Sequence, residues 1–137
     1  MRKEKTYIIK GDPIPLARGR YSSKTNSVWD CQKQEKLIAQ FEMRAQHDNV
    51  SFVGPLHIDV TFFMKIPKNK NSSIAGNSHI FKPDLSNLLK FIEDIGTGIL
   101  YHDDCLIASV FARKIYDENP RTEITVREID TKINCGC

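Results

Sequence analysis

The sequence lacks any apolar segment long enough to cross a membrane. Its longest apolar runs are short, such as Val60–Met64, which Thr61 interrupts, whereas a membrane-spanning helix needs about 20 consecutive apolar residues. The first ten residues, MRKEKTYIIK, carry charges but neither the apolar core nor the small-residue cleavage site of a secretory signal. We therefore expect a cytoplasmic protein with no membrane partner.

Cysteine patterns that indicate a disulfide framework or a zinc site are also missing. The four cysteines form no CxxC pair and have no histidine at metal-ligand spacing. The CGC ending, Cys135 to Cys137, offers two ligands to a soft metal, but two ligands on a frayed tail make a weak site. The pattern, with Cys31 and Cys105, favours free thiols in a reducing compartment.

No internal repeat or low-complexity tract divides the 137 residues, of which 40% are hydrophobic and 27% charged. This length fits one domain over 1–137, which buries roughly two-thirds of its unfolded surface without a covalent staple. The net charge of +3 conceals an asymmetry, because residues 1–82 carry 14 basic and 7 acidic side chains and residues 83–137 carry 6 and 10. The split indicates either a polyanion held by the first part and carboxylate chemistry in the second, or chance.

Apolar periodicity predicts two main helices. The first covers 32–46, with Asp30 as its cap and an apolar stripe of Leu37, Ile38, Phe41 and Ala45. The second covers 84–95 and ends at Gly96, which we expect in the left-handed conformation. Its apolar stripe is formed by Leu85, Leu88, Leu89, Ile92 and Ile95.

Strands are predicted before, between and after these helices. The clearest follows Pro55 and alternates polar residues with Ile58, Val60, Phe62, Met64 and Ile66. Phe63 breaks this alternation, so we expect its second face to be partly covered. Further strands are expected over 6–10, 99–101, 106–116 and 122–129, and a basic irregular stretch follows Pro13. The order indicates an α/β or α+β fold, a small mixed sheet flanked by two main helices.

Two terminal or connecting segments stand apart from this pattern. Residues 67–82, PKNKNSSIAGNSHIFK, form a long basic loop, and loops of this length are usually functional or disordered. Residues 130–137 are expected to be a frayed tail.

The segment with chemical content begins at the second helix. Pro83 disfavours helix before Asp84 and so sets where the helix begins. Ser86, Lys90 and Asp94 follow at intervals of four and share one polar stripe. Asp103 and Asp104 come about one strand later, so carboxylates from two elements converge if that strand lies beside the helix.

Converging carboxylates suit Mg²⁺, which binds hard oxygen ligands and leaves positions for water and phosphate. The structural alternatives are an N-cap at Asp84, a routine ion pair between Lys90 and Asp94, and a turn at Asp103 and Asp104. Spacing alone does not choose between these readings.

A family resemblance does favour one of them. The string KPDLSNLLK over 82–90, followed by Gly98, the Asp103–Asp104 pair and Lys114, resembles the RusA family of Holliday-junction resolvases. The family pattern is Asp-x-Asp-Asn-x-x-Lys, an Asp-Asp pair about 20 residues on, and a lysine one strand later. The opening GDPIPLARGR over 11–20 is also similar to the family's Gly-x-Pro-x-x-x-x-Arg-x-Arg. The resemblance covers residues 6–128 in order.

The resemblance implies a RusA-like fold and a Mg²⁺-dependent endonuclease, often phage-encoded, that works as a homodimer on four-way DNA junctions in recombination and repair. Mn²⁺ is expected to substitute for Mg²⁺. By position, Asp84 and Asp104 match metal-binding aspartates, and Asp103 is the neighbour of Asp104. Lys90 matches the essential helix lysine.

One position departs from the family pattern. The family's second aspartate is Ser86 here, and a hydroxyl is a weak, neutral Mg²⁺ ligand. Asp94 or Asp103 is a candidate to compensate. Otherwise the chain is a weak enzyme or binds junctions without cutting them. A nuclease for branched or flap DNA in general is a further alternative.

Contacts to DNA are expected mainly through phosphates. The candidates are Arg18, Arg20, Lys68, Lys70, Lys82 and Lys114. Four aromatic residues are either base-stacking platforms or, more often in such positions, core: Tyr21, Trp29, Phe81 and Tyr101. His57 and Asp59 are expected to form a polar pair on one strand face rather than a metal site, and His102 is either a turn residue or an aid to proton transfer.

Overall fold

The computed structural model describes residues 3–17, 20–22, 24, 27–29 and 31–129, with the backbone alone for 20–22 and 27–29. Within these residues, no helix is both long and apolar enough to pass through a bilayer. The helices and strands are β1 (Glu4–Lys10), β2 (Arg20–Ser22), β3 (Ser27–Trp29), α1 (Lys33–Gln46), β4 (Leu56–Lys65), the 3₁₀ turn η1 (Ser72–Ile74), α2 (Leu85–Gly96), the 3₁₀ turn η2 (Asp104–Leu106), β5 (Ile107–Asp117) and β6 (Arg121–Glu128).

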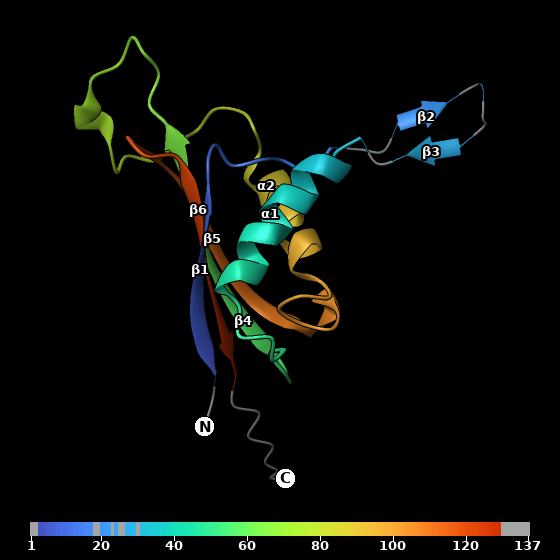
Figure 1. Ribbon diagram of the computed structural model, residues 1–137. Helices are drawn as coiled ribbons and strands as arrows, with labels where there is room; N and C mark the ends of the chain where they lie inside the picture. The colour runs from blue at the N-terminus through green and yellow to red at the C-terminus, as the bar shows by residue number, and fades with distance from the viewer. Residues whose placement is uncertain (1–2, 18–19, 23, 25–26, 30, 130–137) are drawn as a thin grey trace.

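Four strands form one mixed sheet in the order β1-β6-β4-β5. β4 pairs parallel with β5 and antiparallel with β6, and β6 pairs antiparallel with β1. Both α1 and α2 lie on the same face of this sheet (Figure 1). The predicted α+β fold with a mixed sheet and two helices is therefore confirmed.

Strand β4 shows how the sequence pattern builds the core. Its alternating residues Leu56, Ile58, Val60, Phe62 and Met64 are all buried under the helices. The opposite face is partly covered, as expected, because His57, Thr61 and Phe63 are half-buried there although neither helix lies on that side (Figure 1). Phe63 on that face is instead covered by a cation, because the Arg121 guanidinium lies 3.7 Å from its ring centroid.

Helix α1 follows the predicted range but is turned differently. Ala39 and Met43 are its buried residues, whereas the predicted stripe of Leu37, Ile38 and Phe41 is exposed. Polar contacts fix this orientation: Lys36 Nζ lies 2.9 Å from an Asp94 carboxylate oxygen, and the Gln40 amide donates to the Ile95 carbonyl at 3.3 Å. A stripe of apolar residues at helical spacing therefore does not face the core of this chain.

The cap of α1 also differs from the prediction. Asp30 lies outside the described residues, and the N-cap position belongs to Gln32. The Gln32 side chain is buried and faces the preceding segment, where it accepts from the Ala17 N–H and donates to the Pro15 carbonyl, both at 2.7 Å. This residue ties the stretch after β1 to the start of α1.

Helix α2 begins and ends close to the predicted residues, and Leu88, Ile92 and Ile95 of its stripe are buried. The prediction for Gly96 is wrong. Gly96 is the last helical residue, and the positive φ of 86° belongs to Gly98. Gly96 is required for space, because a Cβ there would lie 2.5 Å from the hydroxyl oxygen of Tyr101.

The strand predicted over 99–101 is not formed, and two connecting segments contain short elements that were not predicted. Residues 99–101 form a turn with isolated bridges through Tyr101 rather than a strand. The stretch after Pro13 leads into a two-stranded hairpin, β2–β3, that extends away from the sheet (Figure 1). The segment 67–82 contains η1 and is tied to β5, since the Gly76 N–H donates to the Tyr116 carbonyl and the His79 N–H to the Lys114 carbonyl.

Candidate nuclease site

The N-terminal end of α2 presents Asp84. Asp84 has the N-cap position, yet its carboxylate makes no capping hydrogen bond and instead lies 3.0 Å from the Lys82 ammonium. The Lys114 ammonium donates to the carbonyls of Phe81 and Pro83, both at 2.7 Å. Lys114 therefore fixes the backbone that precedes Asp84. The Asp84 side chain does not cap helix α2, so the structural alternative of an N-cap does not hold for its carboxylate.

Lys90 lies one to two turns further along α2, on the exposed side with Ser86. With Leu16, Ala17 and Asn87 it lines an open hollow of about 230 Å³. The Leu16 N–H donates to the Asn87 carbonyl at 2.9 Å, so the segment that leads towards β2 crosses α2 beside this hollow. The hollow has the size and polarity to receive a phosphate group next to a lysine.

The C-terminal end of α2 faces the Asp103–Asp104 pair. Asp103 caps η2, because its carboxylate accepts from the Cys105 N–H at 3.0 Å, and this contact lowers its pKa. The adjoining Asp104 has a raised pKa, mainly because it shares a hydrogen bond with Asp103, then through some desolvation and through the charges of Asp103 and Asp94. The pair therefore behaves as two carboxylates that repel one another when both are ionised.

Glu93 belongs to the same acidic region and was not identified from the sequence. Burial raises its pKa first and the charge of Asp104 second, while Lys90 lowers it. Tyr101 packs beneath, fully buried, and its hydroxyl donates to the Glu93 carbonyl at 2.9 Å. We name the four carboxylates Glu93, Asp94, Asp103 and Asp104 the acidic cluster. Glu93 is half-buried, whereas the neighbouring Asp94 is exposed and ion-paired with Lys36.

The structure brings together some of the predicted ligands and not others. Asp104 lies near enough to Glu93 and Asp94 of α2 for their charges to affect one another's ionisation. Asp84 lies at the other end of α2, about 15 Å from Asp94 by the helical rise. Among the described residues, no three His, Cys, Asp or Glu side chains are grouped closely enough to hold a metal ion.

Two expected substitutes for the missing aspartate at position 86 have distinct surroundings. Asp94 is ion-paired with Lys36 at 2.9 Å rather than with Lys90. Asp103 remains exposed beside Asp104. Exposed carboxylates that repel one another fit the donor chemistry of Mg²⁺, which binds through one or two carboxylates and keeps several waters.

The DNA-contact candidates are spread over several segments. Lys68 and Lys70 are exposed in the segment 67–82, and the Lys82 side chain is 86% exposed. Arg18 lies outside the described residues, and so does the side chain of Arg20. Lys114 is half-buried and already donates to two carbonyls.

The remaining candidates separate into core and surface. Tyr101 is core, Phe81 is exposed, and the side chains of Tyr21 and Trp29 lie outside the described residues. The expected polar pair is confirmed, since His57 Nε2 lies 3.0 Å from Asp59 and Nδ1 lies 2.6 Å from the Ser109 hydroxyl. His102 is exposed next to Asp103.

This α+β fold presents a lysine and a cluster of carboxylates on and next to helix α2. Such a set of side chains suits an enzyme that acts on phosphodiesters. Comparison with known proteins gives the family. The family model described as endodeoxyribonuclease RusA matches residues 10–127, so the chain belongs to the RusA endodeoxyribonuclease family.

Two relatives extend this finding. An uncharacterized protein of Bacillus subtilis (strain 168), YqaN, is 25% identical over 135 residues, which cover 90% of this chain and 95% of the relative. A crossover junction endodeoxyribonuclease RusA of Lactococcus phage r1t is 38% identical over 76 residues, which cover 55% of this chain and 56% of the phage protein.

Proposed function

We propose that the chain is a metal-dependent, structure-selective endodeoxyribonuclease that resolves four-way DNA junctions by paired symmetric nicks, as a phage or prophage protein acting in the cytoplasm. The observation that carries the proposal is the acidic cluster in a chain of the RusA family, where the charge of Asp104 repels those of Asp103, Asp94 and Glu93. A bound cation would relieve that repulsion.

In this proposal Mg²⁺, or Mn²⁺ in its place, would be held by Asp104 and Asp103. The family pattern also implies Asp84 and Ser86 as ligands, but Asp84 lies about 15 Å from Asp94 along α2, so in this arrangement they do not reach the same ion. When bound, the ion polarises the scissile phosphate and favours attack by water. Lys90 contributes by neutralising charge that develops on the phosphate oxygens, and the hollow beside it supplies room for that group. Lys114 positions Asp84 through the carbonyls of Phe81 and Pro83.

The proposed substrate requires two sites. Resolution needs nicks in two strands of like polarity, and a two-fold homodimer presents two identical sites to a junction that is itself nearly two-fold symmetric. Phosphate contacts are assigned to the basic residues Arg18, Arg20, Lys68, Lys70 and Lys82. Two of the three ammonium hydrogens of Lys114 are used by the carbonyls of Phe81 and Pro83, so we propose that Lys114 contacts a DNA phosphate only through the third.

The test uses the full chain with an end-labelled four-way junction, a flap duplex and a linear duplex. Binding and cleavage are read in the same tubes with Mg²⁺, with Mn²⁺ and with chelator. Symmetric nicks in the junction alone that disappear with chelator are the expected result. Equal cleavage of the flap or linear substrate would overturn the proposed selectivity.

A second candidate is a junction-binding protein with little or no catalysis. It is favoured by Ser86 at the position of a family aspartate and by the separation of Asp84 from the acidic cluster along α2. The variant Ser86→Asp distinguishes the two. If it switches on cleavage in an otherwise silent protein, the binding function describes the native chain. If the native chain already cuts and the variant gains little, the nuclease stands.

A further inference from the structure

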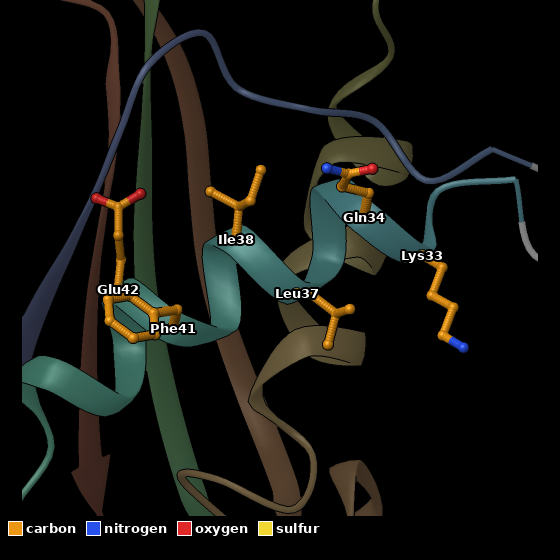
Figure 2. A pocket seen from close by; sticks show the side chains of 6 residues that line it. All are labelled: Lys33, Gln34, Leu37, Ile38, Phe41 and Glu42. Carbon is orange, nitrogen blue, oxygen red and sulfur yellow. The ribbon is translucent and has the colours of Figure 1, made fainter.

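Helix α1 carries an apolar stripe that the body of the protein does not cover. Leu37, Ile38 and Phe41 are 53%, 59% and 74% exposed. With three polar residues they line an open hollow of about 690 Å³, and Figure 2 shows the side chains projecting from successive turns of α1. Those polar residues are Lys33, Gln34 and Glu42.

The stripe continues from α1 onto the edge of the sheet. Phe41 also lines an adjoining hollow of about 400 Å³ together with Ile8 of β1, which is 39% exposed. The combined surface spans three turns of helix, about 16 Å, plus part of a strand. Contiguous exposed apolar surface of this kind marks a protein interaction site.

The edge strand β1 is not free to pair with another strand at this point. Gln46 of α1 accepts from the Ile8 N–H and donates to the Ile8 carbonyl, both at 2.8 Å. The Glu42 carboxylate accepts from the Lys10 N–H at 3.2 Å. Side chains of α1 therefore satisfy these backbone groups, and a partner here must bind by side-chain packing rather than by adding a strand.

The charges at the two ends of the stripe identify the partner. The positively charged Lys33 lies at the start of the stripe and the negatively charged Glu42 lies at its end. A two-fold axis through the middle, between Leu37 and Ile38, would run the helices of two copies antiparallel. It would bring Lys33 of one copy to Glu42 of the other, twice, and pack Leu37 against Ile38. The stripe is complementary to itself.

We propose that this face of α1 is where two copies of the chain associate. The inference rests on the homodimer of the proposed function and deepens it by naming the contact surface. The apolar centre supplies the burial and the Lys33–Glu42 pairs set the antiparallel register.

The first test measures oligomeric state by sedimentation velocity of the full chain. The native protein is expected to be a dimer, and Leu37→Glu combined with Phe41→Glu should raise its dissociation constant about 100-fold, as for central interface residues. The matched control is Phe111→Glu, which places the same charge at a phenylalanine 56% exposed on the uncovered face of the sheet. This control should remain dimeric, and circular dichroism checks that each variant is folded.

The second test separates an intermolecular charge pair from an effect within one chain. Lys33→Glu and Glu42→Lys should each weaken the dimer, because each places like charges together twice. An equimolar mixture of the two variants should associate again, because the heterodimer pairs opposite charges at both ends. Loss of the Glu42 contact to Lys10 within a chain would not be rescued by mixing.

Three outcomes would overturn this surface. They are a monomeric native chain at the concentrations that cleave DNA, an unchanged dimer in the Leu37→Glu, Phe41→Glu variant, and no rescue on mixing. Cleavage of junctions by the same preparations is scored separately. Junction cleavage with an intact variant dimer rejects the surface alone, and an α1-dependent dimer that neither binds nor cuts junctions rejects the function alone.

Discussion

The two ends of α2 carry aspartates of similar exposure in very different electrostatic surroundings. At the N-terminal end, Asp84 is ion-paired with Lys82, and Lys114 fixes the backbone before it. At the other end, the hydrogen bond with Asp103 is the main cause of the raised pKa of Asp104, and burial is the main cause for Glu93. The charges of the neighbouring carboxylates add to both shifts. The charge of Asp84 is therefore already balanced by a lysine, whereas the carboxylates at the other end would be stabilised most by a bound cation.

The largest expected effect comes from removing a carboxylate at either end. Asp84→Asn and Asp104→Asn should each lower junction cleavage about 1000-fold, since each removes a negative charge at a position where the family pattern implies a metal-binding aspartate. Junction binding, measured by gel shift, should change little. Asp12→Asn, at an exposed aspartate outside both ends of α2, is the matched control. Full activity in both site variants would contradict the metal assignment.

Lys90 lies between the two ends and tests whether the helix acts as one site. Lys90→Ala should lower the cleavage rate about 100-fold, because a cation near the phosphate oxygens is lost. Binding of the junction should be nearly unchanged, since a single exposed phosphate contact is worth little. Lys65→Ala, at an exposed lysine on β4, serves as control. A variant that binds weakly but cuts bound junctions at the native rate would reassign Lys90 to DNA binding.

The C-terminal end depends on close packing between Gly96 and Tyr101. Gly96→Ala should destabilise the fold by about 1–3 kcal/mol, because the added methyl overlaps the Tyr101 ring. Tyr101→Phe removes the hydroxyl oxygen that lies 2.5 Å from the new Cβ. The cost of Gly96→Ala should therefore be smaller in the Tyr101→Phe background. Denaturant midpoints of the four proteins measure this, and additive costs would show that the two residues do not interact.

The smallest effect is a shift in titration without loss of structure. In the metal-free protein the carboxyl carbon of Asp104 should titrate above the usual aspartate range by NMR. Asp103→Asn should lower the pKa of Asp104 most, since Asp103 supplies the largest cause, and Asp94→Asn should lower it less. If Asp103→Asn left the pKa of Asp104 unchanged, the proposed electrostatic difference between the two ends of α2 would be contradicted.

Sequence reasoning predicted the parts of this fold that rest on strong periodicity. The alternation in β4 and the apolar stripe of α2 correctly gave the mixed sheet and the second helix. The orientation of α1 was not predictable, because it depends on the Lys36–Asp94 contact between residues far apart in the sequence. Gly96 was misread for a similar reason, since its neighbour Tyr101 is identified only by packing.

For the candidate site, the sequence predicted which residues to consider but not how they are arranged. The resemblance assigned Asp84 and Lys90 to one helix and Asp104 to an Asp-Asp pair next to a strand. The residues that the family model matches, 10–127, include this block. Spacing could not reveal that Asp84 and Asp104 lie at opposite ends of α2. Nor could it identify Glu93, whose part in the acidic cluster follows from its partial burial and from the nearby charge of Asp104.

The central claim is that two identical metal-dependent sites act together on one junction. A supercoiled plasmid that extrudes a four-way cruciform tests it directly, because paired cuts before dissociation release linear DNA whereas single cuts leave nicked circles. With Mg²⁺ the native protein is expected to give linear plasmid, with nicks placed symmetrically across the junction, and nothing with chelator. Nicked circles alone, or an uncut plasmid under either metal, would contradict the account.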